Sequence, residues 1–141
     1  MKRKASAVWT GGLKDGKGVV STGSKTLDKT PYNFNMRFGE EAGTNPEELV
    51  AAAHAGCFAM AFSAILGESK IKPASISAKA VVTLEQVDGG FAVTSSALDV
   101  VAKVPGGDAE KVKAAGAAAK AGCPISKLLN CKVTMKLKVE V

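Results

Sequence analysis

The chain has 141 residues, a length that suits one domain able to bury roughly two thirds of its unfolded surface. Apolar residues make up 46% of it, which excludes an intrinsically disordered chain. The formal net charge is +6, but the basic residues are spread out and no aromatic residues are interleaved with them, so nucleic-acid binding is disfavoured. We expect residues 1–141 to form a single domain.

The N-terminus begins with basic residues, as a signal peptide does, but no apolar run follows them. Export is therefore unsupported, and we expect a cytoplasmic protein whose thiols stay reduced. Residues 49–66 form 18 consecutive uncharged residues, which is the lower length limit for a membrane span. Seven of these residues are alanine, so a helix buried inside the protein is favoured over a membrane segment.

Three short strands are predicted at residues 5–10, 17–22 and 31–38, separated by Gly-rich or polar turns. The third alternates apolar with polar side chains, which places Arg37 on the polar face of a strand. A helix is then predicted from Pro46 to about Gly67, with Asn45 as its N-cap.

Two further strands at 74–87 and 91–104 are joined by the hairpin signal Asp88-Gly89-Gly90. Asp108 is predicted to cap a second helix that runs to about Gly122, and residues 130–141 alternate strictly as a last strand. This order predicts an α+β fold with antiparallel sheets, a long buried central helix and a second helix. The long helix has too little polar surface to lie in water, so we expect its counterpart in a second copy to cover it in a homodimer.

Two cysteines stand in unusual surroundings. Cys57 lies in the middle of the long apolar helix, and Cys123 ends the second helix just before a proline. The two thiols can meet if the helices pack, which would suit one thiol that is oxidised and a second that resolves it. Cys131 lies on the apolar face of the last strand and is interpreted as a small core residue.

A metal site is the less favoured alternative. His54 and Cys57 are three residues apart on one helix face, and Cys123 could add a third ligand. The chain has only one histidine, and its cysteine spacings match no zinc-site pattern, so we expect neither metal nor cofactor. His54 is interpreted as a structural helix residue.

A buried thiol needs a nearby cation to ionise, because burial raises its pKa. Arg37 is the candidate cation, and Glu47 could hold its guanidinium through a bidentate pair. Glu47 and Cys57 are ten residues apart, about 15 Å along one helix and about 80° around it. Either Arg37 spans much of that distance, or Glu47 comes from the antiparallel helix of a second subunit, which we favour.

Three segments carry a family resemblance: PYNFNMRF (31–38), GTNPEELVAAAHAGCFAMAFS (43–63) and KAGCPISKLL (120–129). With the N-terminal strand around Trp9 and the hairpin VDGGF, nearly the whole chain resembles the OsmC/Ohr family of bacterial thiol peroxidases, and the OsmC branch more than the Ohr branch. The resemblance implies an intertwined homodimer with active sites at the subunit interface. It assigns the peroxidatic role to Cys57, the resolving role to Cys123 and orienting roles to Arg37 and Glu47.

The activity implied by this resemblance is antioxidant reduction of organic hydroperoxides through a Cys57 sulfenic acid and a Cys57–Cys123 disulfide. An external dithiol, in the family typically a lipoyl-bearing protein, would reduce that bond. Apolar side chains near the thiol are expected to favour bulky organic hydroperoxides over hydrogen peroxide, namely those of Phe38, Phe58, Met60 and Phe62. The alternative function is a non-enzymatic, stress-related ligand-binding module with a redox-sensitive thiol pair.

Overall fold

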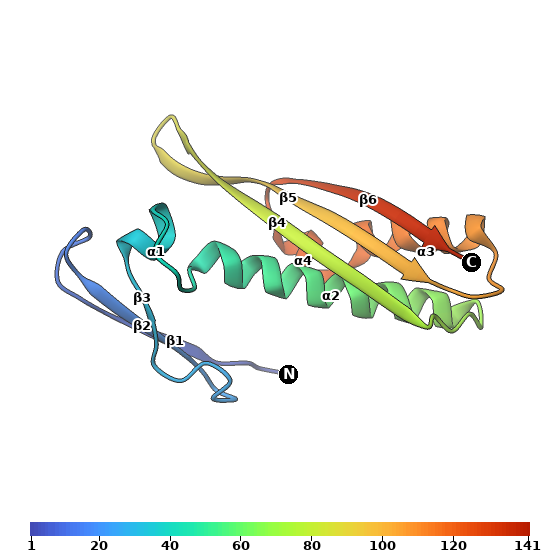
Figure 1. Cartoon of the computed structure of the whole chain (residues 1–141), viewed down its shortest axis with the longest axis horizontal. Helices are drawn as coiled ribbons and strands as arrows, with labels where there is room; N and C mark the ends of the chain where they lie inside the picture. Colours follow the sequence, from blue (N-terminus) through green and yellow to red (C-terminus); the bar gives the residue numbers. More distant parts are fainter. The chain divides into compact units, whose positions relative to one another are not determined.

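The structure is a computed structural model that describes residues 1–141. It divides into two units, Met1–Leu49 and Val50–Val141, and the boundary between them falls within helix α2 (Pro46–Glu68). The elements of both units are labelled in Figure 1. The single-domain organisation stays a prediction from the sequence.

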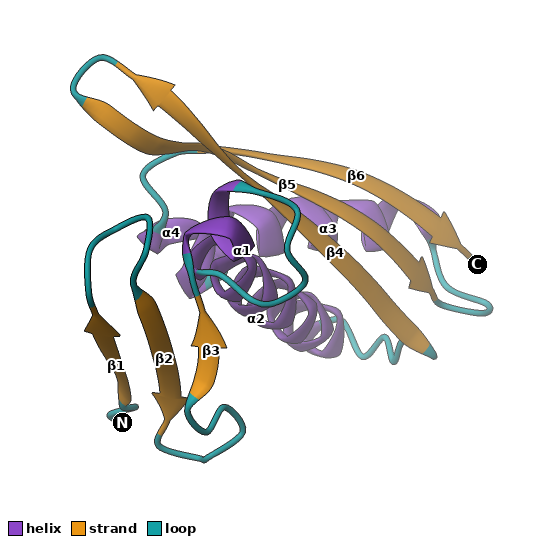
Figure 2. Ribbon diagram, turned by 60° about the vertical axis from the view of Figure 1, so that its left-hand side comes forward, coloured by secondary structure: helices purple, strands orange, loops and turns teal.

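The first unit holds a small antiparallel sheet of β1 (Ala5–Thr10), β2 (Lys17–Thr22) and β3 (Thr30–Tyr32), in that order (Figure 2). The first two strands confirm the sequence prediction. The rings of Trp9 and Tyr32 lie 5.5 Å apart between centroids. Both rings press on Gly18, where an added Cβ would come within 2.5 Å of Tyr32 and 2.7 Å of Trp9, so this strand position has no room for a side chain.

The predicted strand at residues 31–38 is wrong beyond Tyr32, because residues 34–38 form the short helix α1 (Phe34–Phe38). Asn33 caps this helix, and its side-chain oxygen accepts a hydrogen bond from the Met36 backbone N–H at 2.8 Å. The rings of Phe34 and Phe38 lie 4.9 Å apart, as expected of residues four apart on a helix. Arg37 therefore lies on a helix and not on the polar face of a strand.

Helix α2 begins as predicted, with the Asn45 side chain accepting a hydrogen bond from the Glu48 backbone N–H at 2.9 Å. Only one stripe of it is buried in the single chain, at the four-residue spacing of one helix face: His54, Phe58, Phe62 and Leu66. The prediction of a buried central helix thus holds within one chain for that stripe alone. By length and composition α2 could cross a membrane, a test that buried core helices also pass.

The second unit contains β4 (Ser75–Val87), β5 (Gly90–Lys103) and β6 (Lys132–Glu140), in that order across the sheet. The β4–β5 hairpin is confirmed, and Gly89 and Gly90 supply the positive φ angles of its turn. β6 runs parallel to β5, so the expectation of purely antiparallel sheets is wrong. The segment between them is long enough for a crossover, since it holds α3 (Ala109–Gly122) and α4 (Pro124–Leu128).

Helices cover one face of this sheet, as Figures 1 and 2 show. Alternate residues of β5 point into the core, and these are Ser96, Leu98, Val100 and Ala102. They pack with the buried stripe of α2 and with Val112, Ala115 and Ala119 of α3. The N-cap of α3 is Asp108, as predicted, and Cys123 at its C-terminal end is part of the same core. The core therefore fixes the position of one candidate thiol.

Candidate active site

Cys57 on α2 and Cys123 between α3 and α4 meet in the second unit, with their Sγ atoms 3.1 Å apart. The predicted meeting of the two thiols is confirmed. Both are free, and an S–S bond of about 2.05 Å would need them to approach by only about 1 Å. Cys123 is fully buried, whereas Cys57 is partly exposed. A reagent from solution therefore reaches Cys57 first.

The two thiols differ in their electrostatic surroundings. Burial raises the pKa of Cys57; a backbone hydrogen bond from Ile125 opposes this, and the neighbouring Cys123 adds to it. Burial also acts to raise the pKa of Cys123, but hydrogen bonds from Ser126, Cys57 and Ile125 outweigh it and bring that pKa below its ordinary value. The Ser126 backbone N–H lies 3.4 Å from Cys123 Sγ at the start of α4. A thiol–thiol hydrogen bond joins the two sulfur atoms.

Arg37 and Glu47 form the predicted bidentate pair within the first unit. Arg37 Nε donates to Glu47 Oε2 at 3.1 Å, and Nη2 donates to Oε1 at 2.7 Å. Hydrogen bonding to Glu47 raises the pKa of Arg37, so its charge is permanent. Because the thiols belong to the other unit, the convergence of all four side chains in one site stays a prediction.

A cavity of about 240 Å³ lies beside Arg37 in the first unit. Its walls are largely aromatic, and it is lined by Trp9, Leu13, Tyr32, Asn33, Phe34, Arg37 and Phe38. The expectation that Phe58 and Phe62 supply substrate-facing surface is wrong, because both are fully buried in the core with their ring centroids 5.7 Å apart. Met60 is 77% exposed and Phe38 lines the cavity, so these two side chains remain able to contact a substrate.

The sequence predicts His54 to be a structural helix residue but does not predict its hydrogen-bond partners. It is fully buried; Nδ1 lies 2.7 Å from Ser96 Oγ and Nε2 lies 2.8 Å from Ser126 Oγ. Burial lowers the pKa of His54, which keeps the ring neutral. In the sequence, His54 lies at the same four-residue spacing as the apolar residues of the buried stripe. A buried imidazole needs hydrogen-bond partners, so this position indicates that His54 has such partners.

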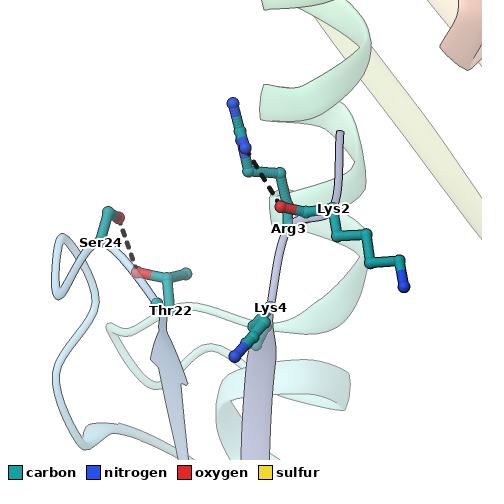
Figure 3. Close-up of a pocket in the computed structure, with 7 residues that line it drawn as sticks. Lys2, Arg3, Lys4, Thr22 and Ser24 are labelled. Carbon is teal, nitrogen blue, oxygen red and sulfur yellow. Dashed lines mark hydrogen bonds between the residues drawn. The ribbon is translucent and has the colours of Figure 1, made fainter.

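A cavity of about 660 Å³ lies elsewhere in the first unit and is lined by residues 2–5 and 22–24. Figure 3 shows its basic side chains and the 3.2 Å contact between the hydroxyls of Thr22 and Ser24. It contains none of the four candidate catalytic side chains. No group of three or more His, Cys, Asp or Glu side chains is placed to hold a metal ion.

The family model described as OsmC-like protein matches residues 39–138, which is more than half of the chain. The chain belongs to the OsmC-like protein family. Peroxiredoxin OsmC of Escherichia coli K12 is 49% identical over 138 residues, covering 98% of this chain and 96% of the relative. The organic hydroperoxide resistance protein of Xanthomonas axonopodis pv. citri is 34% identical, covering 94% and 92% of the two chains.

Solved structures of the family share this fold. The organic hydroperoxide resistance protein OhrB of Bacillus subtilis superposes with a TM-score of 0.72 at 30% identity, covering 97% of this chain and 98% of that one. The α+β fold predicted from the order of the elements is therefore confirmed.

Proposed function

We propose that this protein is a cysteine-based hydroperoxide reductase that detoxifies organic hydroperoxides. The observation that carries the proposal is the pair of free thiols 3.1 Å apart, one partly exposed and the other buried. The names of the relatives, peroxiredoxin OsmC and organic hydroperoxide resistance protein, support the same activity.

Exposure supports Cys57 as the peroxidatic residue and Cys123 as the resolving residue. The Cys57 thiolate attacks the outer peroxide oxygen, the O–O bond breaks, and the alkoxide leaves and takes up a proton as the alcohol. Cys57 is left as a sulfenic acid. Cys123 then forms the S–S bond while the sulfenic oxygen leaves, with a proton, as water.

Arg37 supplies the positive charge that the partly buried Cys57 thiolate needs, because burial raises the pKa of that thiol. Glu47 engages Nε and Nη2 of Arg37, so the guanidinium is held in one orientation while Nη1 stays available for a peroxide oxygen. The aromatic cavity beside Arg37 favours a hydroperoxide with a bulky organic group over hydrogen peroxide.

The protein acts as a homodimer in this proposal. The face of α2 away from its buried stripe carries small or apolar exposed residues, namely Ala52, Ala53, Gly56, Met60, Ser63 and Ala64. A second copy of the helix would cover this face. Glu47 lies about 15 Å before Cys57 along α2, so the Arg37–Glu47 pair of one copy serves the thiols of the other.

We further propose that an external dithiol, such as a lipoyl-bearing protein, restores the thiols by exchange and that the reaction takes place in the reducing cytoplasm. The proposal is tested by the consumption of cumene hydroperoxide with dihydrolipoamide as the reductant. The wild type should turn over, Cys57→Ser should not, and Cys131→Ser should match the wild type because that half-buried thiol lies outside the pair. Consumption by Cys57→Ser at the wild-type rate would contradict the proposal.

A further inference from the structure

A buried chain of polar side chains leads from the core of the second unit to the thiol pair. His54 of α2 contacts Ser96 of β5 through Nδ1 at 2.7 Å and Ser126 of α4 through Nε2 at 2.8 Å. Ser126 in turn donates its backbone N–H to Cys123 Sγ at 3.4 Å. His54 and Ser96 are both fully buried, so no water competes for the bond between them. Three separate elements are thus tied to one sulfur atom.

The direction of the hydrogen bonds follows from the donors available. The Ser126 backbone N–H donates to Cys123 Sγ, and hydrogen bonding to Ser126 lowers the pKa of that thiol. Neutral His54 carries a single N–H, so one of its two serine partners accepts that proton and the other donates its hydroxyl proton to the bare ring nitrogen. Both ring nitrogens of His54 are therefore satisfied, and Ser126 is held at both its hydroxyl and its backbone N–H.

We propose that His54 is a positioning residue for the resolving step: it anchors Ser126, whose backbone N–H donates to Cys123 Sγ, and so speeds the attack of Cys123 on the Cys57 sulfenic acid. The inference rests on the proposed peroxidase function. In this step the sulfur electron pair of Cys123 forms the S–S bond and the S–O bond of Cys57 breaks. The departing hydroxide combines with the former thiol proton of Cys123, giving water.

The role belongs to the second step only. The hydrogen bond from Ser126 goes to Cys123, whereas Cys57 receives its backbone hydrogen bond from Ile125 and meets this network only through the Cys123 thiol. Removing the Ser126 hydroxyl should therefore leave the first oxidation of Cys57 nearly unchanged. Hydrogen bonds to charged groups are strong enough that the loss of one should slow disulfide formation on the order of tenfold. A merely structural histidine would instead affect stability without separating the two steps.

The test follows both steps after reduced protein is mixed with one equivalent of cumene hydroperoxide. Quenched samples are measured by intact mass, which separates the one-oxygen gain of a sulfenic acid from the loss of the two thiol protons in a disulfide. Ser126→Ala should accumulate the sulfenic acid, with disulfide formation about tenfold slower and its pH midpoint moved upward. Ser126→Thr keeps a hydroxyl and should restore the rate.

His54→Gln and His54→Leu extend the comparison, because a glutamine amide can hydrogen-bond the Ser126 hydroxyl whereas leucine cannot. His54→Gln should resolve faster than His54→Leu. Ser95→Ala is the matched control, since Ser95 is next to Ser96 on β5 but faces the other side of the sheet. If His54 variants do not fold, as thermal unfolding would reveal, the Ser126 pair still decides the question.

Equal disulfide-formation rates in wild type, Ser126→Ala and Ser126→Thr would overturn the inference. That result differs from failure of the proposed function, in which the wild type itself would not be oxidised by one equivalent of hydroperoxide. Slowing of both steps by the same factor in Ser126→Ala would also overturn it, because it would indicate a general structural defect.

Discussion

The Sγ atoms of Cys57 and Cys123 lie 3.1 Å apart although the residues are 66 positions apart in the chain. The core holds the Cys123 sulfur atom in this position, since Cys123 packs among the buried residues of α2, α3 and β5. Disulfide formation therefore needs little movement of the sulfurs.

Replacing Arg37 should slow the first oxidation. Arg37→Gln removes the proposed cation, so the pKa of Cys57, already raised by burial, rises further and the thiolate fraction at pH 7 falls. We expect a roughly tenfold to hundredfold lower second-order rate with cumene hydroperoxide, with its pH midpoint moved upward. Glu47→Gln should cause a smaller loss because the charge remains. Stopped-flow kinetics measures both variants.

The control for that experiment is Lys113→Gln, which removes the exposed ion pair between Lys113 and Glu110, a contact of 2.8 Å. Its oxidation rate should equal that of the wild type. An Arg37→Gln rate within twofold of this control would show that Arg37 does not assist Cys57.

Mixing two inactive variants tests which copy supplies Arg37. In a heterodimer of Arg37→Gln and Cys57→Ser, one site combines the intact Cys57 of the first copy with the intact Arg37 of the second. If the site is shared between copies, random exchange should restore about a quarter of wild-type peroxidase activity. If each copy uses its own Arg37, the mixture stays as inactive as its components. Activity after subunit exchange is the measurement.

A charge on the exposed face of α2 should disrupt the dimer. Met60 is 77% exposed in the single chain, and Met60→Lys places an ammonium group where the second copy would pack. Sedimentation should then show monomer, and the peroxidase rate should fall because Arg37 of the second copy is lost. Ala117→Lys, at an exposed position of α3, should remain dimeric. A dimeric Met60→Lys protein would contradict the proposed interface.

The pH dependence of stability should report on His54. Its pKa is lowered in the folded state, so the unfolded chain binds more protons and the free energy of unfolding falls as pH drops below about 6.5. His54 is the only histidine, and most carboxyl groups titrate lower, so the slope between pH 7 and 5 belongs largely to it. Urea unfolding should show that slope in the wild type and a flatter one in His54→Gln. Equal slopes would show that His54 is not held neutral.

Much of the fold follows from local sequence signals. Asn45 and Asp108 are strong N-caps, and Asp88-Gly89-Gly90 is a strong turn, so the elements around them were predicted nearly to the residue. The strand predicted at residues 31–38 failed because apolar residues spaced by two also lie four apart, which suits a helix equally well. The hydrogen bond from the Met36 backbone N–H to the Asn33 side chain caps the helix and favours it over a strand.

The candidate site was only partly predictable, because local sequence signals do not reveal contacts between residues that are far apart in the chain. The opposite charges of Arg37 and Glu47 can be read from the sequence, which predicts their bidentate pair. The partners of His54 were not, because Ser96 and Ser126 are 42 and 72 residues away and only the tertiary fold brings them together. The parallel pairing of β6 with β5 likewise depends on the α3 crossover rather than on any pattern within the strand.

The most direct test of the account is intact-mass analysis and thiol counting of reduced protein after one equivalent of cumene hydroperoxide, in wild type, Cys57→Ser and Cys123→Ser. The account predicts rapid loss of two thiols with no added oxygen in the wild type. It also predicts no rapid change in Cys57→Ser and the gain of one oxygen in Cys123→Ser. Slow oxidation at the same rate in all three proteins would contradict the peroxidase assignment and leave a binding module with a redox-sensitive thiol pair.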